Sequence, residues 1–497
     1  MGVVKYQSIR SSILIYLGFA IGAVNMFVFP HFFSGDQFGL TRMLGDIGVI
    51  MVPFCTFSTG PMLNKFFPYY AGHLPEKKND LLAWVFLISV IGFLLFVAGT
   101  FIFKGLIIKA YIEKSKLFID YFYLLYPYVF GMVMYAVFEN YSWSRHQSVV
   151  SNSIKELGIR IMTSVLLVLY ILKWISFDVF MWAFSLLYIA GVIALIIYLQ
   201  RKHLFFLNFS ISSVTRRFGK RMATFSLSIM FASVFIIVAN NIDGIFISSL
   251  KGLDQAGYLM IATYMGMMIQ VPQRSIASIA TPVMAQAWKD KNMEKIDEIY
   301  KKSSILQLIV GLFILLVIWL NIDNIYHFMP PAYASAKYVV LYLGIAKVID
   351  MGTGANQQLL STSRLWRFEL TSAMVLVCMS IPLNYFLIRE YGAVGSGYSN
   401  LISMFTFNTI RYIFIWKRFG LQPFSFNTLK AILIGLAAYF LCRLLPEINN
   451  VFVSIFVKGS CFTVLYASGI MLFRVSDDVY YTSLSILNKA KNIILKK

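Results

Sequence analysis

Apolar segments about 20 residues long recur along almost the whole chain, and they constrain the fold more than any other feature. A helix needs about 20 mostly apolar residues to cross the hydrocarbon core of a bilayer. Segments of this length without period-two alternation exclude an outer-membrane barrel. The sequence therefore predicts an all-α polytopic membrane protein with about 14 transmembrane helices. The predicted spans are 12–32, 43–68, 81–103, 117–139, 157–175, 178–200, 222–249, 257–281, 303–322, 336–359, 368–388, 392–416, 428–445 and 450–473.

The charge content agrees with this prediction and bears on possible partners. Only 13% of the 497 residues are charged, whereas a soluble globular chain has about a quarter. The net charge of +21 would favour nucleic acid as a partner if the chain were soluble. The basic residues, however, lie in short gaps between apolar segments, where they meet anionic headgroups. We therefore expect membrane lipids and not nucleic acid as partners.

The positions of Lys and Arg predict the orientation of the spans. Basic residues fill the segment before the first span and then every second gap, as loops on the cytoplasmic side do. We expect a multi-pass protein of a bacterial-type inner (plasma) membrane with both termini in the cytoplasm. One gap on the expected outer side is also basic and is an exception to the pattern: it holds Lys104, Lys109, Lys114 and Lys116.

The chain also repeats itself. The residues DQFGL at 36–40 follow the first span, and DQAGY at 254–258 follow the seventh. The same offset places Asn25 on Asp243 and Glu139 on Gln357. Each half then holds six spans, so both copies point the same way, and such parallel repeats are typical of transporters. We predict an N-lobe at 1–210, a C-lobe at 211–418, and two further helices with a basic tail at 419–497.

Three short segments resemble a known superfamily. Residues 384–397 read NYFLIREYGAVGSG and resemble the boundary between the eleventh and twelfth helices of polysaccharide exporters in the MATE-like (MOP) superfamily. Residues 241–247 (NIDGIFI) and 254–258 resemble the seventh and eighth helices of that superfamily. The resemblance spans the whole chain in architecture, and the most similar members are the Wzx-type oligosaccharide flippases.

The resemblance implies two six-helix lobes around a central cavity that opens alternately to each side of the membrane. It also implies a cargo, a polyprenyl-diphosphate-linked oligosaccharide unit for a surface polysaccharide such as O-antigen of the cell envelope, and other polysaccharide-assembly enzymes as partners. Two other functions stay open on the sequence: a cation-coupled exporter of small amphipathic compounds, and a membrane-embedded glycan polymerase or ligase.

Ionised side chains at membrane depth are costly to insert, and they are therefore the best candidates for functional residues. Arg274 lies about two-thirds along the eighth span, and Lys347 lies near the middle of the tenth. We predict that both bind the diphosphate of the substrate. Two other interpretations remain: Arg274 could reach the cytoplasmic interface, and Lys347 could form an ion pair with Asp350, three residues later on the same helix face.

The remaining candidates concern coupling and gating. Asp243 and Asp350 could bind H⁺ or Na⁺ and couple transport to an ion gradient, although Asp243 could instead be a structural cap. Arg42 and Asp46 have the spacing of an i, i+4 pair, which we expect at the membrane interface. The gate or cavity candidates are Asn25, Arg42, Asp46, Glu139 and Gln357.

No motif predicts catalysis or a resident cofactor or metal. The four cysteines lie in apolar segments without the spacing of metal ligands, and the five histidines are scattered. The glycine cluster at 392–397 has neither a preceding strand nor a following Lys-Ser/Thr, so it is not a phosphate-binding loop. We therefore expect a transporter and not an enzyme.

Overall fold

The computed structural model describes residues 2–145, 147–365, 367–446 and 448–481. Within these ranges, the side chains of residues 2–16, 232, 274, 275, 278, 279, 282 and 285 lie outside the description. The described residues form helices joined by short loops, with no strand among them. They divide into two compact units, Met1–Gly257 and Tyr258–Lys497.

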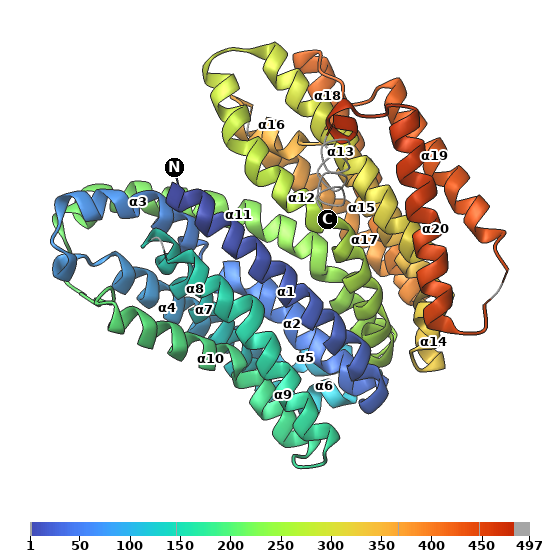
Figure 1. Ribbon diagram of the computed structural model, residues 1–497. Coiled ribbons are helices and arrows are strands. Elements are labelled where there is room, and N and C mark those ends of the chain that lie inside the picture. The colour runs from blue at the N-terminus through green and yellow to red at the C-terminus, as the bar shows by residue number, and fades with distance from the viewer. Residues whose placement is uncertain (1, 146, 366, 447, 482–497) are drawn as a thin grey trace, which may run out of the picture. The chain divides into compact units, whose positions relative to one another are not determined.

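The first unit is a bundle in which α7 packs against α2, α3, α4 and α10 (Figure 1). After α4, residues 104–120 form two short helices, α5 and α6, and not a span. The helices of the unit are α1 Gly2–Phe32, α2 Gly35–Thr56, α3 Thr59–His73, η1 Glu76–Lys78, α4 Leu81–Ile102, α5 Lys104–Tyr111, α6 Lys116–Asp120, η2 Phe122–Leu124, α7 Leu125–Ser144, α8 Ser148–Ser153, the π-helical η3 Ile154–Gly158, α9 Ile159–Ile171, α10 Phe177–Arg201 and α11 Ser213–Leu250.

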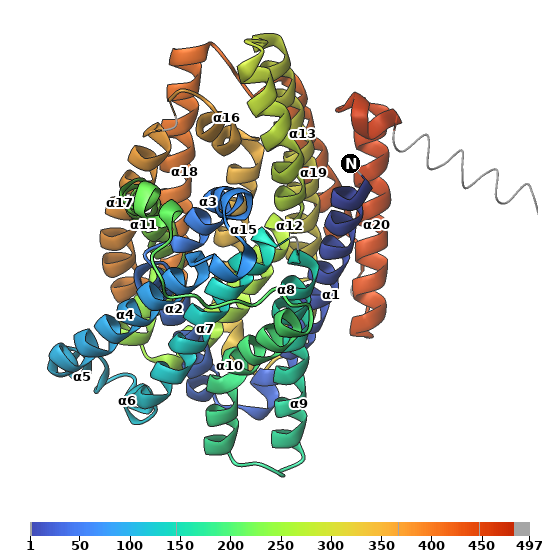
Figure 2. The same ribbon diagram turned by 90° about the vertical axis from the view of Figure 1, so that its left-hand side faces the viewer.

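The second unit contains most of α12, Leu253–Lys289, which begins in the first unit. The last two helices pack onto α13, and Figure 2 shows α13 and α19 side by side. The Tyr466 hydroxyl of α20 donates to the Ile309 carbonyl of α13 at 3.0 Å. The remaining elements are α13 Met293–Leu320, α14 Ile322–His327, η4 Pro331–Ala336, α15 Lys337–Gly352, α16 Asn356–Thr362, α17 Arg367–Tyr391, α18 Ala393–Phe419, α19 Phe426–Arg443 and α20 Val451–Leu472.

The predicted all-α membrane fold is confirmed. Every predicted span falls on helical residues, although some, such as 43–68, extend over more than one helix, and 10 helices in the described part of the chain are long and apolar enough to cross a membrane. In α1 the described apolar part is the shorter stretch Leu17–Phe32. The number 14 therefore stays a prediction. The boundary between the units also leaves α11 with the first unit, so the division into lobes at residue 210 stays a prediction as well.

The second predicted span, 43–68, is wrong in detail because two helices occupy it. Helix α2 begins at Gly35 and ends at Thr56, and α3 begins at Thr59. Between them, Phe57 and Ser58 both have left-handed backbone conformations, with φ of 49° and 51°. The Ser226 hydroxyl of α11 donates to the Phe57 carbonyl at 2.6 Å. A contact from a distant helix thus satisfies a carbonyl that the break removes from the helical ladder.

The two copies of the repeated motif contact one another. The backbone N–H of Asp254 donates to the Asp36 carboxylate at 3.1 Å, and these residues are repeat partners. A Cβ added at Gly39 would lie 1.7 Å from the Leu253 carbonyl oxygen, and one at Gly257 would lie 2.9 Å from the Gly35 carbonyl oxygen. Only glycine permits this approach of two helix starts. The motif is thus a packing motif at the contact between α2 and α12.

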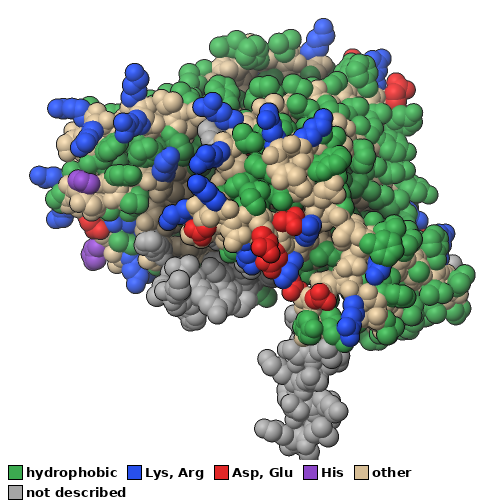
Figure 3. All heavy atoms as spheres, turned by 90° about the horizontal axis from the view of Figure 1, so that it is seen from above, with side chains coloured by type: hydrophobic (Ala, Val, Ile, Leu, Met, Phe, Trp, Pro, Cys, Tyr) green, Lys and Arg blue, Asp and Glu red, His purple; other side chains and the backbone are tan. Residues whose placement is uncertain are grey.

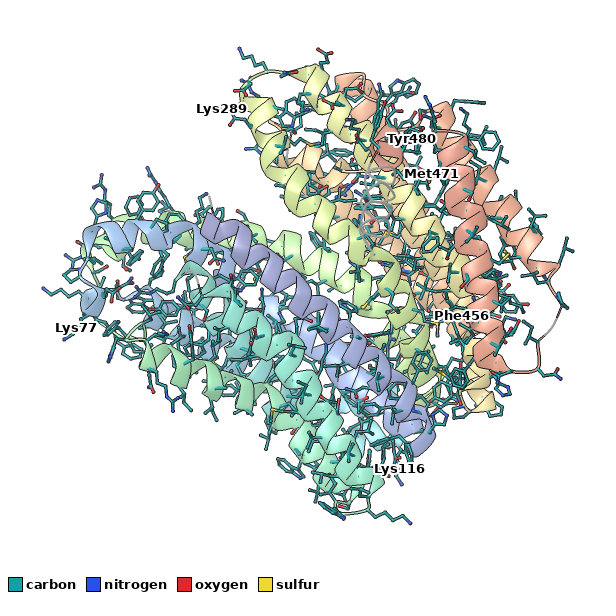
Figure 4. All side chains as sticks on the ribbon, viewed as in Figure 1. Lys77, Lys116, Lys289, Phe456, Met471 and Tyr480 are labelled. Atoms are coloured by element: carbon teal, nitrogen blue, oxygen red, sulfur yellow. The ribbon has the colours of Figure 1, made fainter. Side chains whose placement is uncertain are left out.

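The residues labelled in Figure 4 show which ends of the helices they occupy. Figure 4 shows Lys77 and Lys116 at opposite ends of the first unit, as the prediction for the exceptional basic gap requires. In the second unit, Lys289 and Tyr480 lie at one end of the bundle, and Phe456 lies farther toward the other end of α20.

Candidate functional site

The first unit holds a buried ionic cluster that joins α2 to α11. Arg42 Nε lies 3.1 Å from Asp46 Oδ2, and Arg42 Nη2 lies 3.7 Å from Asp243 Oδ1. The side chains of Arg42 and Asp243 are each 6% exposed, and that of Asp46 is 15% exposed. One guanidinium therefore faces two carboxylates away from water. A cluster of this kind carries one negative charge more than its cation neutralises, unless a proton or another cation is bound.

The position of this cluster corrects one expectation. The i, i+4 pair of Arg42 and Asp46 forms as predicted, but it does not open the helix at an interface. Because α2 begins at Gly35, both residues lie within the helix, and the packing of α11 buries them. Gly244 makes this packing possible, since a Cβ there would lie 1.7 Å from Asp46 Oδ2.

The second unit holds a polar network around Asp350 of α15. One carboxylate oxygen accepts hydrogen bonds from Gln270 Nε2 at 3.1 Å and Gln273 Nε2 at 3.0 Å, both from α12. The other accepts from Asn408 Nδ2 of α18 at 3.2 Å. Three amide donors from two other helices thus satisfy the carboxylate oxygens of Asp350. Lys347 lies one turn earlier on α15 and is half-buried.

Beside this network lies a buried ion pair whose residues are not among the predicted site residues. Arg411 Nη2 of α18 lies 2.6 Å from Glu369 Oε1 of α17, and Arg411 Nε donates to the Ser372 hydroxyl at 3.1 Å. The Arg411 side chain is 4% exposed. The argument that selected Arg274, an ionised residue inside an apolar span, applies equally to Arg411 and could have identified it.

The other predicted residues have separate partners. Glu139 of α7 pairs with Lys155 Nζ at 2.9 Å. Asn25 of α1 donates to the Arg160 carbonyl at 3.2 Å and accepts from the Ser164 hydroxyl at 2.8 Å, so it links α1 to α9. Gln357 is exposed on α16. Arg274 lies in α12, but its side chain is outside the described residues.

The glycine cluster after α17 forms a helical hairpin. Gly392 has a φ of 59°, which ends α17 and precedes α18. A Cβ at Gly395 would lie 2.0 Å from the Leu387 carbonyl oxygen, so this position permits the two helices to pack closely. Among the described residues, no group of three or more His, Cys, Asp or Glu side chains could hold a metal ion.

Comparisons with known proteins agree with this architecture. In solved structures, the fold is similar to "Lipid II flippase MurJ, inward closed conformation" with a TM-score of 0.73 at 15% identity, covering 94% of this chain and 98% of that one. It is also similar to an inward-facing multidrug resistance MATE family transporter of the MOP superfamily, with a TM-score of 0.65 at 13% identity, covering 82% and 94%. These likenesses show the fold.

Two family models match the sequence itself. The model for polysaccharide biosynthesis proteins matches residues 7–288, and the MatE model matches residues 228–386. No curated protein sequence matches the chain. The first match covers more than half of the chain and confirms the resemblance found in the sequence. This protein therefore belongs to the polysaccharide biosynthesis protein family.

Proposed function

We propose that the protein is a flippase that moves a polyprenyl-diphosphate-linked oligosaccharide unit from the inner to the outer leaflet of the plasma membrane. The observation that carries this proposal is the polysaccharide biosynthesis family match over residues 7–288. The fold shared with a lipid II flippase over 94% of the chain supports it. The glycan head would cross through a polar pathway while the lipid tail stays in the bilayer, and both chain termini would face the cytoplasm.

The proposal gives roles to charged residues of the membrane helices. A diphosphate cannot enter a low-dielectric pathway without cations, and Arg274 and Lys347 would supply them. The network around Asp350 supports this assignment because it brings polar groups from α12, α15 and α18 to one place near Lys347. Asp243 and Asp350 would bind the coupling H⁺ or Na⁺. Other polysaccharide-assembly enzymes would supply and consume the lipid-linked unit.

Analysis of lipid-linked intermediates by leaflet tests the proposal. Deletion of the protein should cause lipid-linked oligosaccharide units to accumulate on the inner leaflet, and re-expression should clear them. A membrane-embedded polymerase or ligase would instead leave units that have been flipped but not joined. Intermediates that reach the outer leaflet at the wild-type rate in the deletion strain would contradict the proposal.

A second candidate function is the cation-coupled export of small amphipathic compounds. The MatE match over residues 228–386 favours it. Such an exporter would change the sensitivity of cells to amphipathic cations and leave the glycan intact. Measurement of drug accumulation and surface polysaccharide in the same deletion strain therefore separates the two functions.

A further inference from the structure

An apolar cavity of about 450 Å³ lies entirely within the first unit, between α3, α4 and the start of α11. It adjoins the break between α2 and α3. Neither the ionic cluster of Arg42 nor the network of Asp350 contributes to it. Its lining includes Phe57, Thr59, Trp84, Gly219, Ala223 and Leu227.

Gly219 on α11 leaves part of this space open. A Cβ added there would meet no heavy atom within 4 Å. Glycine inside a helix is less favourable than alanine, and here close backbone packing does not require it. The space therefore accommodates a larger side chain, or an apolar molecule that enters from outside the protein.

Two polar atoms in the wall of the cavity lack partners among the described residues. Thr59 Oγ1 and Trp84 Nε1 are both buried and make no hydrogen bond there. A buried donor without a partner is unfavourable, because it loses its hydrogen bonds to water and gains none in the protein. A purely hydrocarbon occupant would leave both atoms unsatisfied, whereas a molecule with an apolar chain and an ester oxygen could accept from them.

Two cations lie on the same face of α11 as the cavity lining. Arg216 and Lys220 are exposed, and the i, i+3 and i, i+4 spacing of a helix aligns them with Ala223 and Leu227. Two carboxylates at this end already have partners: Asp80 accepts from the backbone N–H of Ser212 at 2.9 Å and from the Thr215 hydroxyl at 2.7 Å, and Glu76 pairs with Arg145 at 2.7 Å.

Basic side chains are abundant at this end of the first unit. Figure 3 shows Lys and Arg gathered over the end that carries Lys77 in Figure 4. An anionic headgroup would thus meet a surface of complementary charge at the end of the unit that holds the apolar cavity. The loop-charge pattern places this end in the cytoplasm, and anionic lipids are concentrated in the cytoplasmic leaflet.

We propose that this cavity binds an anionic phospholipid of the cytoplasmic leaflet. One acyl chain occupies the space beside Gly219, and the phosphate lies between Arg216 and Lys220. An ester oxygen accepts from Trp84 Nε1 or from the Thr59 hydroxyl. The lipid holds the start of α11 against α3 and α4, and this role is independent of the transported substrate.

Native mass spectrometry and thermal unfolding of the purified full chain test the proposal. Phosphatidylglycerol and phosphatidylcholine with identical acyl chains are added to the protein in detergent. The wild type should retain phosphatidylglycerol and unfold at a higher temperature with it than with phosphatidylcholine. Equal retention of the two lipids, with equal melting temperatures, would overturn the proposal.

Substitutions in the cavity locate the site. Gly219→Leu fills the space and should abolish lipid retention, and Ala223→Leu is a second substitution of the same kind if the first does not fold. Gly459→Leu on α20, where a Cβ also meets open space, is the matched control and should retain the lipid. Full retention of phosphatidylglycerol by both cavity variants would show that the lipid binds elsewhere.

Substitutions of the cations test the headgroup contact. Arg216→Gln with Lys220→Gln should weaken the binding of phosphatidylglycerol about tenfold or more, because each change removes a charged hydrogen-bond donor. Lys417→Gln with Arg418→Gln removes the same charge at the end of α18 and should have no such effect. Displacement of the lipid by an equimolar polyprenyl diphosphate would overturn the proposal, because the cavity would then be a substrate site.

Discussion

At the scale of single residues, buried charges organise both units. In the first unit, Arg42 faces two carboxylates from two helices, and in the second unit Arg411 pairs with Glu369. A buried ion pair adds little net stability, but the loss of one partner leaves an uncompensated charge that is very unfavourable. We therefore expect the substitution of one such residue to lower the stability of the protein strongly.

Gly244 should be intolerant of any side chain, because its Cα faces the carboxylate of Asp46. Gly244→Ala should lower the free energy of unfolding by about 1–3 kcal/mol, the usual cost of overpacking. Gly219→Ala on the same helix is the matched control, and it should be neutral or stabilising by up to about 1 kcal/mol. Thermal unfolding in detergent measures both variants, and equal melting temperatures would contradict the packing described for Asp46.

The ion pair of Arg411 and Glu369 should be structural. Arg411→Met should destabilise the protein by about 3–5 kcal/mol, because Glu369 then remains buried without its cation. The double variant Arg411→Met, Glu369→Met removes both charges and should recover most of that loss. If the double variant is no more stable than the single one, the two residues do not depend on one another.

Arg274 should be required for transport under the proposed function. Arg274→Ala should abolish or sharply reduce flipping of the lipid-linked unit at a normal level of inserted protein. Arg274→Lys should restore flipping only in part, because an ammonium group cannot make the paired hydrogen bonds of a guanidinium to a diphosphate. Leaflet analysis of the intermediates measures this, and full flipping by Arg274→Ala would leave the residue with an anchoring role only.

At the scale of helices, the most informative contact joins the two copies of the repeated motif. The starts of α2 and α12 meet through Asp36 and Asp254, with Gly39 against Leu253. Helices that rock against one another during alternating access must separate or rotate at such a contact. Under the proposed function, the transport cycle would strain this contact.

A disulfide across this contact should stop transport. In a variant without the four native cysteines, Asp36→Cys with Asp254→Cys should form a cross-link under oxidation, and flipping should cease until a reductant is added. Asn324→Cys with Ser454→Cys is the matched control, because these residues hydrogen-bond at 3.0 Å between α14 and α20 within the second unit. Unchanged flipping by a fully cross-linked α2–α12 variant would show that the contact stays closed throughout the cycle.

At the scale of the whole molecule, the loop charges predict the topology. Single cysteines at Lys77, Lys202 and Lys295 should react with a membrane-impermeant reagent only from the cytoplasmic side, and a cysteine at Lys116 only from outside. Figure 4 supports the contrast within the first unit, since Lys77 and Lys116 lie at opposite ends of its helices. Labelling of Lys77 from outside, or of Lys116 from the cytoplasm, would overturn the topology.

The sequence alone was sufficient to predict a helical membrane transporter. The length and polarity of a span are local properties, because the bilayer imposes the same requirement on every segment separately. The repeated motif and the short segments that resemble the superfamily are local as well. The same reasoning identified Arg42 and Asp46 as an i, i+4 pair.

Only the tertiary structure determined which distant residues meet. Asp243 joins Arg42 across about 200 residues of chain, and the amides that hold Asp350 come from two other helices. The break at Phe57 is stabilised by Ser226 of α11, and no glycine or proline occupies the two positions of the break. Contacts between distant residues, breaks in helices and cavities all depend on how the helices pack. The apolar pattern of a span is nearly the same for every possible packing, so this pattern does not reveal them.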